Sequence, residues 1–524
     1  MKSGILELRK QIFNYLKNKA LSYEVGSEEL DLYFSNQEKF SDRDFEVCTM
    51  DHLLSKVKDT DVTFIGDFHT FDQNIRNVLR IIKILITQDH TPIIGLEMID
   101  SSYQLILDTY LEGHLTELEF LEEIDYHDSW RFPWTHYKLI FELAKEFQIE
   151  IIALNKKGTL LERDQFAADL LAKINNEQPD KKLIVLYGEL HIAPNKMPAL
   201  LEKLNPNLEK LIIHQNLDKV YWKLAESGSQ AETVCFNPHE FCILTAPPWV
   251  KYESMVYWYE NLCNDPEFDI HHYIIENGKK IFSDDTHENF SLICEQIISF
   301  LGLEITIDQI DDFNLYDHTN LEYVEETLTS SMDKALRTFY QNLIARNHSF
   351  CFLGNKFYCS SYSMNRISYL AGIHLSHFYF EKKNLNSLSA LTDSKTASFF
   401  TLHVWEGVFA YFFSKIINPH RKCELYLDFK KSNTPKDKIL LNLFTAKTFP
   451  KSLEDRDKML VFEVANRFGH VLGEYLYQKE IDKNDSSLLH DTLSFLSFNF
   501  EDLTNQRDLI LKDVDYQRHQ KRYF

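Results

Sequence analysis

The sequence predicts an α/β fold, with a mostly parallel sheet covered by helices on both faces, followed by a helix-rich C-terminal domain. Three observations lead to this prediction. Short apolar, β-branched runs alternate with helical stretches between residue 62 and about residue 217. Long stretches with helical spacing follow from about residue 284. Glycine and proline are scarce, at 15 and 13 of 524 residues, which favours long helices over frequent turns.

Five strands are expected in the first part of the chain. The first, VTFIGD, is a continuous apolar run typical of a strand buried on both faces, and NIRNVLRIIKILITQ after it has apolar residues at helical spacing. The other four expected strands are PIIGLEM, IEIIALN, KKLIVLYGEL and EKLIIHQ, at residues 92–98, 149–155, 181–190 and 209–215. Residues 233–246 add one or two further strands. Repeated strand–helix–strand units place parallel strands side by side.

The pattern changes after residue 248. An Asn-Gly pair between apolar runs predicts a β-hairpin at residues 273–282, and SFCFLGNKFYCSSY predicts another at 349–362. Long helical stretches are expected at residues 363–381, 395–418, 453–480 and 486–510. The expected organisation is an N-terminal helical extension (1–50), an α/β domain (51–248), a connecting region with a β-hairpin (249–320) and a helix-rich C-terminal domain (321–524).

Charge and cysteine content restrict the partners and the compartment. A formal net charge of −23 repels phosphate backbones and anionic lipid, so we expect no nucleic-acid partner. The eight cysteines contain no C-x-x-C pair and are expected to be reduced. The N-terminus has no apolar signal core, and no uncharged apolar run approaches the roughly 20 residues that cross a bilayer. These features predict a cytoplasmic protein with no membrane span.

Polar residues follow the expected strands at their carboxyl ends, where ligands bind in open parallel sheets. The first strand runs into Gly66-Asp67-Phe68-His69 and the fourth into Gly188-Glu189-Leu190-His191, so a glycine–acid–x–histidine segment occurs twice. Glu97 lies near the end of the second strand. Asn155 and His214 end the third and fifth strands and are secondary candidates. We therefore expect these groups to meet at one edge of the sheet.

Convergence of Asp67, Glu97 and Glu189 would be costly without compensation. At about 5 Å and an effective dielectric of about 20, each like-charge pair costs about 3 kcal/mol. A divalent cation, a shared proton or an imidazolium must therefore balance the charge. With His69 and His191, the carboxylates form a candidate ligand set for Zn, Mn or Fe. Without metal, the same groups support acid–base catalysis, with a histidine or a carboxyl activating water.

These motifs resemble those of a known family. The succession VTFIGDFHT, IIGLEMID, LDTYLEGHLTELEF, HDSWRF, HYKLIFELAKEF, IIALNKKG and LIVLYGELHIAP, over about residues 50–245, is similar to the ChaN family of the haem-binding-uptake and Tiki superfamily. The resemblance implies an α/β domain, and it assigns the roles of the superfamily's hydrolases to His69, Glu97 and His191. It also implies haem binding through a tyrosine. No tyrosine matches by motif; the available ones are Tyr103, Tyr110, Tyr126, Tyr137 and Tyr187.

Three functions are expected from these observations. The first is a ChaN-like pocket protein that binds haem, iron or another metal-containing ligand at or near the strand ends. The second is a hydrolase of ester or peptide bonds that uses a divalent metal or direct acid–base chemistry. The third is a non-enzymatic scaffold. No motif indicates a nucleotide cofactor, and the helical domain is expected to provide contacts with a protein partner or a second copy.

Two histidine–glutamate pairs in the helical part also share helix faces. They are His403 with Glu406 and His470 with Glu474. Such spacing suits a metal site in a helix bundle. It is also the spacing of a common ion pair on a helix, which is the interpretation we favour.

Overall fold

The structure is a computed structural model of the chain, and the ranges it describes are residues 2–23, 28–88, 90–229, 231–259, 286–310, 312–361, 363–392, 396–432, 434–482 and 487–517. Two compact units are present, which we call the α/β unit (residues 11–270 with 522–524) and the helical unit (residues 1–10 with 271–521). The four-part division expected from the sequence remains a prediction. The hairpin expected at residues 273–282 lies outside the described residues.

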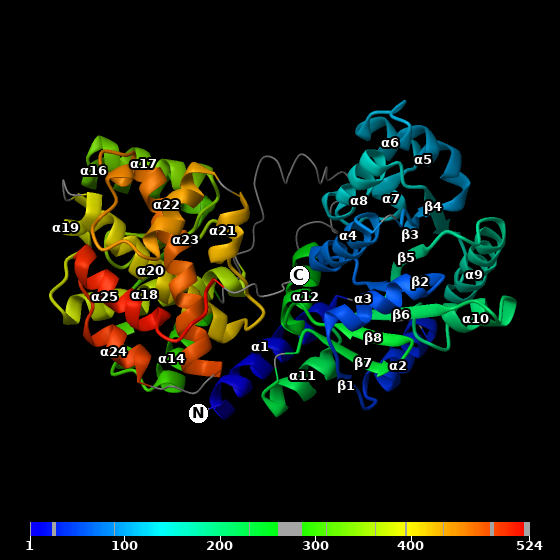
Figure 1. Cartoon of the computed structure of the whole chain (residues 1–524), viewed down its shortest axis with the longest axis horizontal. Helices are drawn as coiled ribbons and strands as arrows, with labels where there is room; N and C mark the ends of the chain where they lie inside the picture. Colours follow the sequence, from blue (N-terminus) through cyan, green and yellow to red (C-terminus); the bar gives the residue numbers. More distant parts are fainter. Residues whose placement is uncertain are drawn as a thin grey trace. The chain divides into compact units, whose positions relative to one another are not determined.

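The α/β unit is built on one sheet, whose strands lie in the order β1-β7-β8-β6-β2-β5-β3-β4 within the described residues (Figure 1). Their bounds are β1 (Glu46–Val47), β2 (Val62–Asp67), β3 (Ile93–Asp100), β4 (Ile151–Asn155), β5 (Leu183–Gly188), β6 (Lys210–Gln215), β7 (Thr233–Asn237) and β8 (Glu240–Ile243). The strands from β8 to β4 pair in parallel, whereas β7 is antiparallel to β8 and β1. The structure confirms the mostly parallel sheet that the sequence predicts. Strand β7 adds antiparallel pairing at one edge of that sheet.

Helices cover both faces of this sheet. Side chains alternate along β2, so that Phe64 belongs to the core under α9 and α10, while Ile65 belongs to the core under α3, α4 and α8. The helices of the unit are α1 (Lys2–Ser22), α2 (Glu28–Ser41), α3 (Met50–Asp59), α4 (Asp72–Ile86), η1 (Ser101–Tyr103), α5 (Gln104–Leu111), α6 (Glu117–Glu123), α7 (Tyr126–Ser129), α8 (Trp134–Phe147), α9 (Leu160–Glu177), α10 (Met197–Leu204), α11 (Asp218–Ser227) and α12 (Pro248–Tyr257). Residues 2–10 of α1 belong to the helical unit. The expected covering of both sheet faces is confirmed.

The helical unit is centred on three long helices, α18, α20 and α23. Their backbones come close because glycines face them: a Cβ built on Gly469 would lie 2.4 Å from the Val404 carbonyl oxygen, and one on Gly372 would lie 2.7 Å from Ala410 Cα. The helices are α14 (Thr286–Leu301), α15 (Ile307–Ile310), η3 (His318–Asn320), α16 (Leu321–Ser331), α17 (Lys334–Ala345), α18 (Met364–Lys382), α19 (Ser387–Thr392), α20 (Thr396–Ile417), α21 (Tyr426–Ser432), α22 (Pro435–Leu443), η4 (Lys451–Leu453), α23 (Lys458–Tyr477), η5 (Gln478–Asp482), α24 (Leu488–Ser494) and α25 (Phe500–Leu511).

A small sheet completes the helical unit. Strands β10 (Phe350–Phe352) and β11 (Lys356–Tyr358) form an antiparallel hairpin, which confirms the one expected at residues 349–362. Strand β9 (Asn314–Tyr316) pairs in parallel with β11. This third strand has only three residues, too few for a periodic signal in the sequence.

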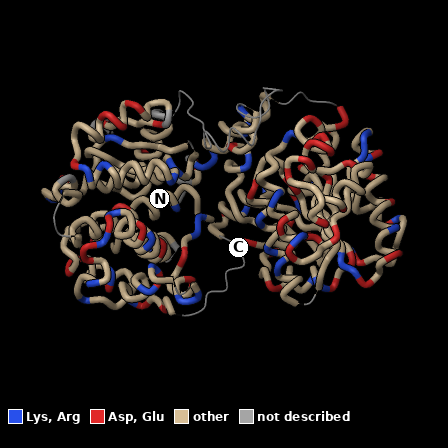
Figure 2. Tube along the Cα trace, turned by 90° about the horizontal axis from the view of Figure 1, so that it is seen from above, with Lys and Arg blue, Asp and Glu red and all other residues tan. Residues whose placement is uncertain are grey.

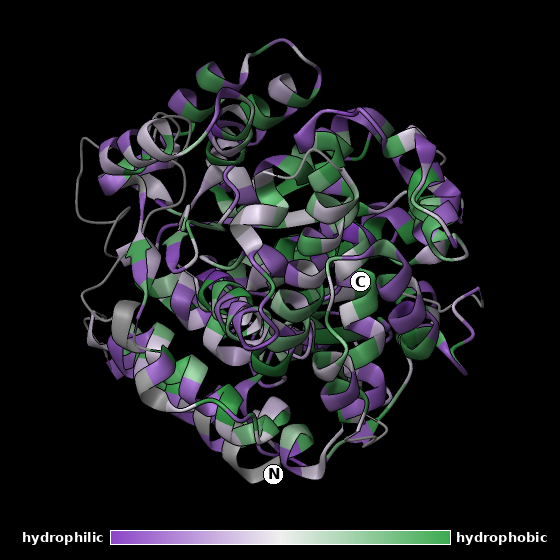
Figure 3. Cartoon of the chain, turned by 90° about the vertical axis from the view of Figure 1, so that its left-hand side faces the viewer, coloured by the Kyte–Doolittle hydropathy of each residue, from purple (hydrophilic) through white to green (hydrophobic). Residues whose placement is uncertain are grey.

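Charge and hydropathy are mixed along the chain. Acidic and basic residues are interspersed in both units (Figure 2). Hydrophobic and hydrophilic residues alternate along many helices (Figure 3), as expected of amphipathic helices around a core. Among the described residues, no helix combines the length and the apolar character that crossing a membrane requires.

Candidate functional site

Three neighbouring strands bring the main candidate residues together. Strands β2, β5 and β3 are adjacent in the sheet and run in parallel. His69 follows the end of β2, His191 follows the end of β5, and Glu97 lies within β3. Because the carboxyl ends of parallel strands meet at one edge, residues far apart in sequence become neighbours there.

Glu97 is the centre of this site. Its Oε2 lies 3.9 Å from His69 Nε2, and its Oε1 lies 3.8 Å from His191 Nε2. The backbone N–H of Gly188 donates to Glu97 Oε2 at 2.6 Å. The carboxylate is buried, at 4% side-chain exposure, whereas 24% of the His69 side chain is exposed. A ligand would therefore approach from the side of His69.

Gly188 has no side chain at the meeting point of these groups, so they lie close together around its backbone. A Cβ at this position would lie 3.1 Å from Glu97 Oε2, 3.3 Å from His69 Nε2 and 3.4 Å from His191 Cδ2. A side chain here would press against all three residues. A glycine at this position therefore allows the three groups to come this close together.

Each histidine is held by an aspartate through its other ring nitrogen. His69 Nδ1 lies 2.9 Å from Asp67 Oδ2, and His191 Nδ1 lies 2.5 Å from Asp164 Oδ1. A tyrosine supports each aspartate: Tyr137 donates to Asp67 at 2.7 Å, and Tyr33 donates to Asp164 at 2.8 Å. These contacts orient both imidazoles so that Nε2 faces Glu97.

The compensating charge at Glu97 comes from an arginine. Arg163 Nη2 donates to Glu97 Oε1 in an ion pair. Burial alone would raise the pKa of Glu97, but His191, His69, Arg163 and the Gly188 N–H together lower it below its ordinary value. Burial opposes protonation of His69, but Asp67, followed by Glu97, raises its pKa above the ordinary value. The site therefore holds an ionised carboxylate beside an imidazole that readily gains a proton.

Arg163 and Asp164 are site residues that were not expected from the sequence. Both lie near the N-terminal end of α9, whose start is marked by a capping box between Thr159 and Glu162. This helix follows strand β4, so its N-terminus lies near the carboxyl ends of the strands. The available signal in the sequence was an Arg-Asp pair directly after a capping box. The spacing of these residues alone could not show that Arg163 faces Glu97.

The secondary candidates differ in their relation to the site. Asn155 joins it indirectly, because its Oδ1 accepts from Arg163 Nε at 3.0 Å. His214 does not take part: its Nε2 lies 2.9 Å from Glu240 Oε1, a buried carboxylate that also pairs with Arg43.

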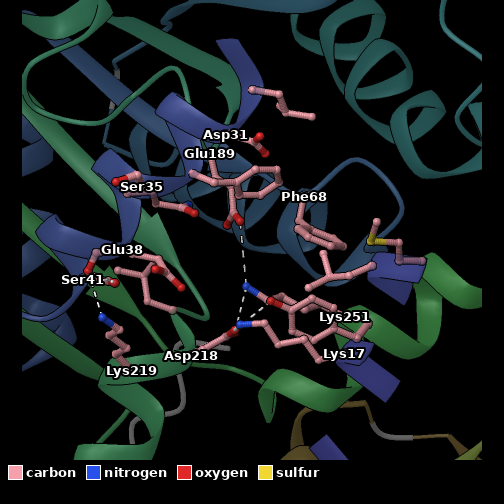
Figure 4. A pocket seen from close by; sticks show the side chains of 17 residues that line it. Lys17, Asp31, Ser35, Glu38, Ser41, Phe68, Glu189, Asp218, Lys219 and Lys251 are labelled. Carbon is pink, nitrogen blue, oxygen red and sulfur yellow. Dashed lines mark hydrogen bonds and ion pairs between the residues drawn. The ribbon is translucent and has the colours of Figure 1, made fainter. Parts of the chain in front are cut away.

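The Glu189 backbone N–H donates to the Asp67 carbonyl oxygen at 2.9 Å, but the Glu189 side chain lines a cavity that neither Asp67 nor Glu97 lines. Glu189 Oε1 is 3.9 Å from the ammonium of Lys251, which is 3.0 Å from Asp218 (Figure 4). The cavity has a volume of about 500 Å³ and is lined by polar and apolar side chains from α1, α2, α12 and the ends of β2, β5 and β6, including Phe68.

The five predicted metal ligands are thus not brought into one shell. Glu189 is separate, Asp67 lies behind His69, and a guanidinium already occupies Glu97. Within the described ranges, no three His, Cys, Asp or Glu side chains are arranged to hold a metal ion. A cation placed beside Glu97 would also be repelled by Arg163.

Comparison with known proteins supports the resemblance for part of the α/β unit. Residues 53–163 match the family model described as "Haem-binding uptake, Tiki superfamily, ChaN", which confirms the resemblance for this segment. The segment contains His69, Glu97 and Arg163 and ends before Glu189 and His191. It covers well under half of the chain.

One solved structure is also similar, and it is described as "Cofacial heme binding to ChaN of Campylobacter jejuni". It shares 13% sequence identity with this chain at a TM-score of 0.28, and the match covers 32% of this chain and 87% of that one. A likeness this distant supports no argument about the site. No curated protein matches the chain.

Proposed function

We propose that the α/β unit is a hydrolase of ester or amide bonds, and that His69, Glu97 and His191 activate water without a metal. The observation that carries this proposal is the meeting of His69 Nε2 and His191 Nε2 at Glu97, where they lie 3.9 Å and 3.8 Å from its two carboxylate oxygens. An acid, a base and a partly exposed approach meet at that point, as water-mediated hydrolysis requires.

His69 is the general base in this proposal. A water beside Gly188 would transfer one proton to His69 Nε2. Its other O–H would donate a hydrogen bond to Glu97. Asp67 would stabilise the imidazolium through Nδ1, which is the role of the carboxylate in a base–carboxylate dyad. The resulting hydroxide attacks the carbonyl carbon of the substrate.

His191 is the general acid. Its Nε2 also faces Glu97, and Asp164 fixes its orientation through Nδ1. When the bond to the leaving group breaks, His191 Nε2 would donate a proton to the departing oxygen or nitrogen. Arg163 keeps Glu97 ionised throughout, so that the carboxylate remains a hydrogen-bond acceptor for water.

The test is a panel of chromogenic esters and fluorogenic peptides with the full chain and three variants, His69→Ala, Glu97→Gln and His191→Ala. We expect each to lower kcat/KM by at least about 100-fold, the usual contribution of a general acid or base. His114→Ala is the matched control, because 70% of this side chain is exposed in the same unit. A wild type inactive on the whole panel, or variants as active as His114→Ala, would contradict the proposal.

Haem binding is the second candidate, and the description of the family model over residues 53–163 favours it. The tyrosines of this region fit poorly as haem ligands. Burial raises the pKa of Tyr110 to about 12 and that of Tyr126, Tyr137 and Tyr187 well above the ordinary value. Tyr103 is half-buried and remains the better candidate.

Haemin titration separates the two candidates. Stoichiometric binding with a Soret band that weakens in Tyr103→Phe, but not in Tyr137→Phe, would support the haem function. Weak absorbance that does not saturate at one equivalent would count against it. Ester hydrolysis measured on the same preparations shows which activity the α/β unit has.

The proposal includes a cytoplasmic location. Cys48 and Cys235 contact each other through their side chains, and burial raises the pKa of Cys48 to about 12. Two thiols in contact stay reduced in a reducing compartment. Fractionation of cells that express the tagged full chain tests this location, and recovery with exported proteins would contradict it. Contacts of the helical unit with a protein partner or a second copy remain a prediction.

A further inference from the structure

The helical unit contains a second group of chemically active side chains. Cys351 lies on β10, His377 on α18 and Glu406 on α20, so three separate elements supply them. Cys351 Sγ is 3.8 Å from His377 Nδ1, and His377 Nε2 is 2.7 Å from Glu406 Oε1. A thiol beside an imidazole that a carboxylate orients is the arrangement of an activated nucleophile.

The local backbone holds the thiol against the imidazole. The hairpin turns at Leu353 and Gly354, which have φ values of 52° and 79°, a region that glycine adopts without strain. The Gly354 carbonyl oxygen lies 3.1 Å from Cys351 Sγ and 3.2 Å from His377 Nδ1. This carbonyl oxygen can accept a hydrogen bond from the Cys351 thiol or from His377 Nδ1. It therefore stabilises the pair whether the shared proton is on the sulfur or on the imidazole.

Exposure differs within the group in the way a nucleophilic site requires. Cys351 is half-buried, whereas His377 is only 8% exposed. Glu406 has 13% of its side chain exposed, and its second oxygen, Oε2, lies 2.7 Å from His403 Nδ1. The carboxylate is therefore held from both sides, and its hydrogen bond to His377 fixes the imidazole plane.

We propose that Cys351, His377 and Glu406 form a nucleophilic site on the helical unit that accepts acyl groups from activated esters or thioesters. Cys351 Sγ attacks the carbonyl carbon while its proton passes to His377 Nδ1. The bond between the carbonyl carbon and the leaving group breaks, and the departing alcohol or thiol takes the proton from His377. The product is a thioester on Cys351, which water hydrolyses to regenerate the thiol.

Burial and neighbouring charges determine the pH dependence of this step. Burial raises the pKa of the Cys351 thiol, and His377 partly offsets this. Burial opposes charge on His377, but Cys351 and Glu406 raise its pKa well above the ordinary value. Acylation should therefore accelerate as pH rises and His377 becomes neutral. Among the described residues, His403, His374, Tyr340 and Tyr369 are further titratable groups that interact with this cluster.

The test uses the full chain, with 4-nitrophenyl acetate as the acyl donor and peptide mass spectrometry as the readout. It is run in wild type and in His69→Ala, so that turnover in the α/β unit cannot be mistaken for acylation. We expect Cys351 to be acetylated at least about 10-fold faster than Cys423 in the same molecule. Cys423 is a matched control because it is also half-buried in the helical unit, with its Sγ 3.6 Å from a carbonyl oxygen.

Two variants test the roles. His377→Gln should slow acetylation of Cys351 by about 100-fold, the usual contribution of a general base. Glu406→Gln should move the rise in rate to lower pH, because it removes the charge that raises the pKa of His377. A purely structural Glu406 would not move this profile. Thermal melting of each variant shows whether it folds.

The comparison of Cys351 with Cys423 within the wild type needs no variant, so it decides the question even if His377→Gln does not fold. Equal reaction rates of the two cysteines would overturn the proposal. A folded His377→Gln chain that reacts as fast as the wild type would also overturn it. Neither result bears on the proposed hydrolysis at His69.

Discussion

Replacement of Arg163 by methionine tests whether the arginine supplies the countercharge at Glu97. The change keeps the apolar stem and removes the guanidinium, which leaves a carboxylate of 4% side-chain exposure without its arginine partner. Breaking a buried ion pair in this way costs about 3–5 kcal/mol. Because 20% of the Arg163 side chain is exposed, we expect the lower end, about 3 kcal/mol.

The assay is urea unfolding of the full chain, followed by a probe of the α/β unit such as tryptophan fluorescence. At about 2–4 °C per kcal/mol, the same change should lower the melting temperature of this unit by about 6–12 °C. Glu97→Gln and the double variant complete a double-mutant cycle. The double variant should be less destabilised than the sum of the two single variants, because glutamine needs no countercharge.

The pH dependence provides an independent check. In the wild type the folded-state pKa of Glu97 is lowered, so its contribution to stability is present above the ordinary pKa and is lost as pH falls through the folded value. In Arg163→Met the pKa of Glu97 rises. The difference in unfolding free energy between the variant and the wild type should therefore shrink as pH falls below the ordinary pKa of glutamate, because a protonated Glu97 needs no countercharge. A variant as stable as the wild type, or a destabilisation that does not change with pH, would refute the role assigned to Arg163.

Four further predictions concern other parts of the chain. Gly188→Ala should lower turnover at least about 10-fold with little loss of secondary structure in circular dichroism, because its Cβ would crowd Glu97 Oε2; unchanged turnover would contradict the proposed place for water. His214→Gln should lower stability in urea by about 1–3 kcal/mol through its lost bond to Glu240 and leave turnover unchanged. Lys251→Met should destabilise the α/β unit by about 3 kcal/mol in urea because Asp218, with 15% of its side chain exposed, loses a partner, and a neutral effect would contradict this. Glu406 has its pKa lowered to about 2, so its contribution of about 3 kcal/mol to the helical unit should be lost as pH falls from about 4.5 to 2, a loss that unfolding curves of Glu406→Gln should not show.

The sequence predicted the part of the site that depends on the sheet. His69, Glu97 and His191 meet because each lies at or near the carboxyl end of a parallel strand, and apolar runs identify such strands reliably. Glu189 did not join them because β5 ends at Gly188 and the chain then turns. The alternation of side chains that placed Glu189 beside His191 holds only in an extended chain.

The groups that complete the site come from helices, where sequence patterns are less informative. Tyr33 on α2 contacts Asp164 on α9 across 131 positions in the sequence, and no periodicity indicates such a contact. The sequence analysis expected a divalent cation, a shared proton or an imidazolium to balance the carboxylates, whereas the ion-pair partner of Glu97 is a guanidinium. Its source, Arg163, depends on how α9 packs against the sheet, which a single sequence does not show.

Each of the two proposed sites has a glutamate between two histidines, but the sites differ in what balances the charge of that glutamate. At Glu97 the nearest cation is a guanidinium, which keeps its charge at every pH at which proteins fold. At Glu406 the partners are the imidazoles of His377 and His403, and an imidazole loses its charge as pH rises. The carboxylate of the α/β unit thus stays paired while its histidines exchange protons, as repeated acid–base turnover requires. The helical unit gives up its countercharge at high pH, which frees His377 to take the proton of Cys351.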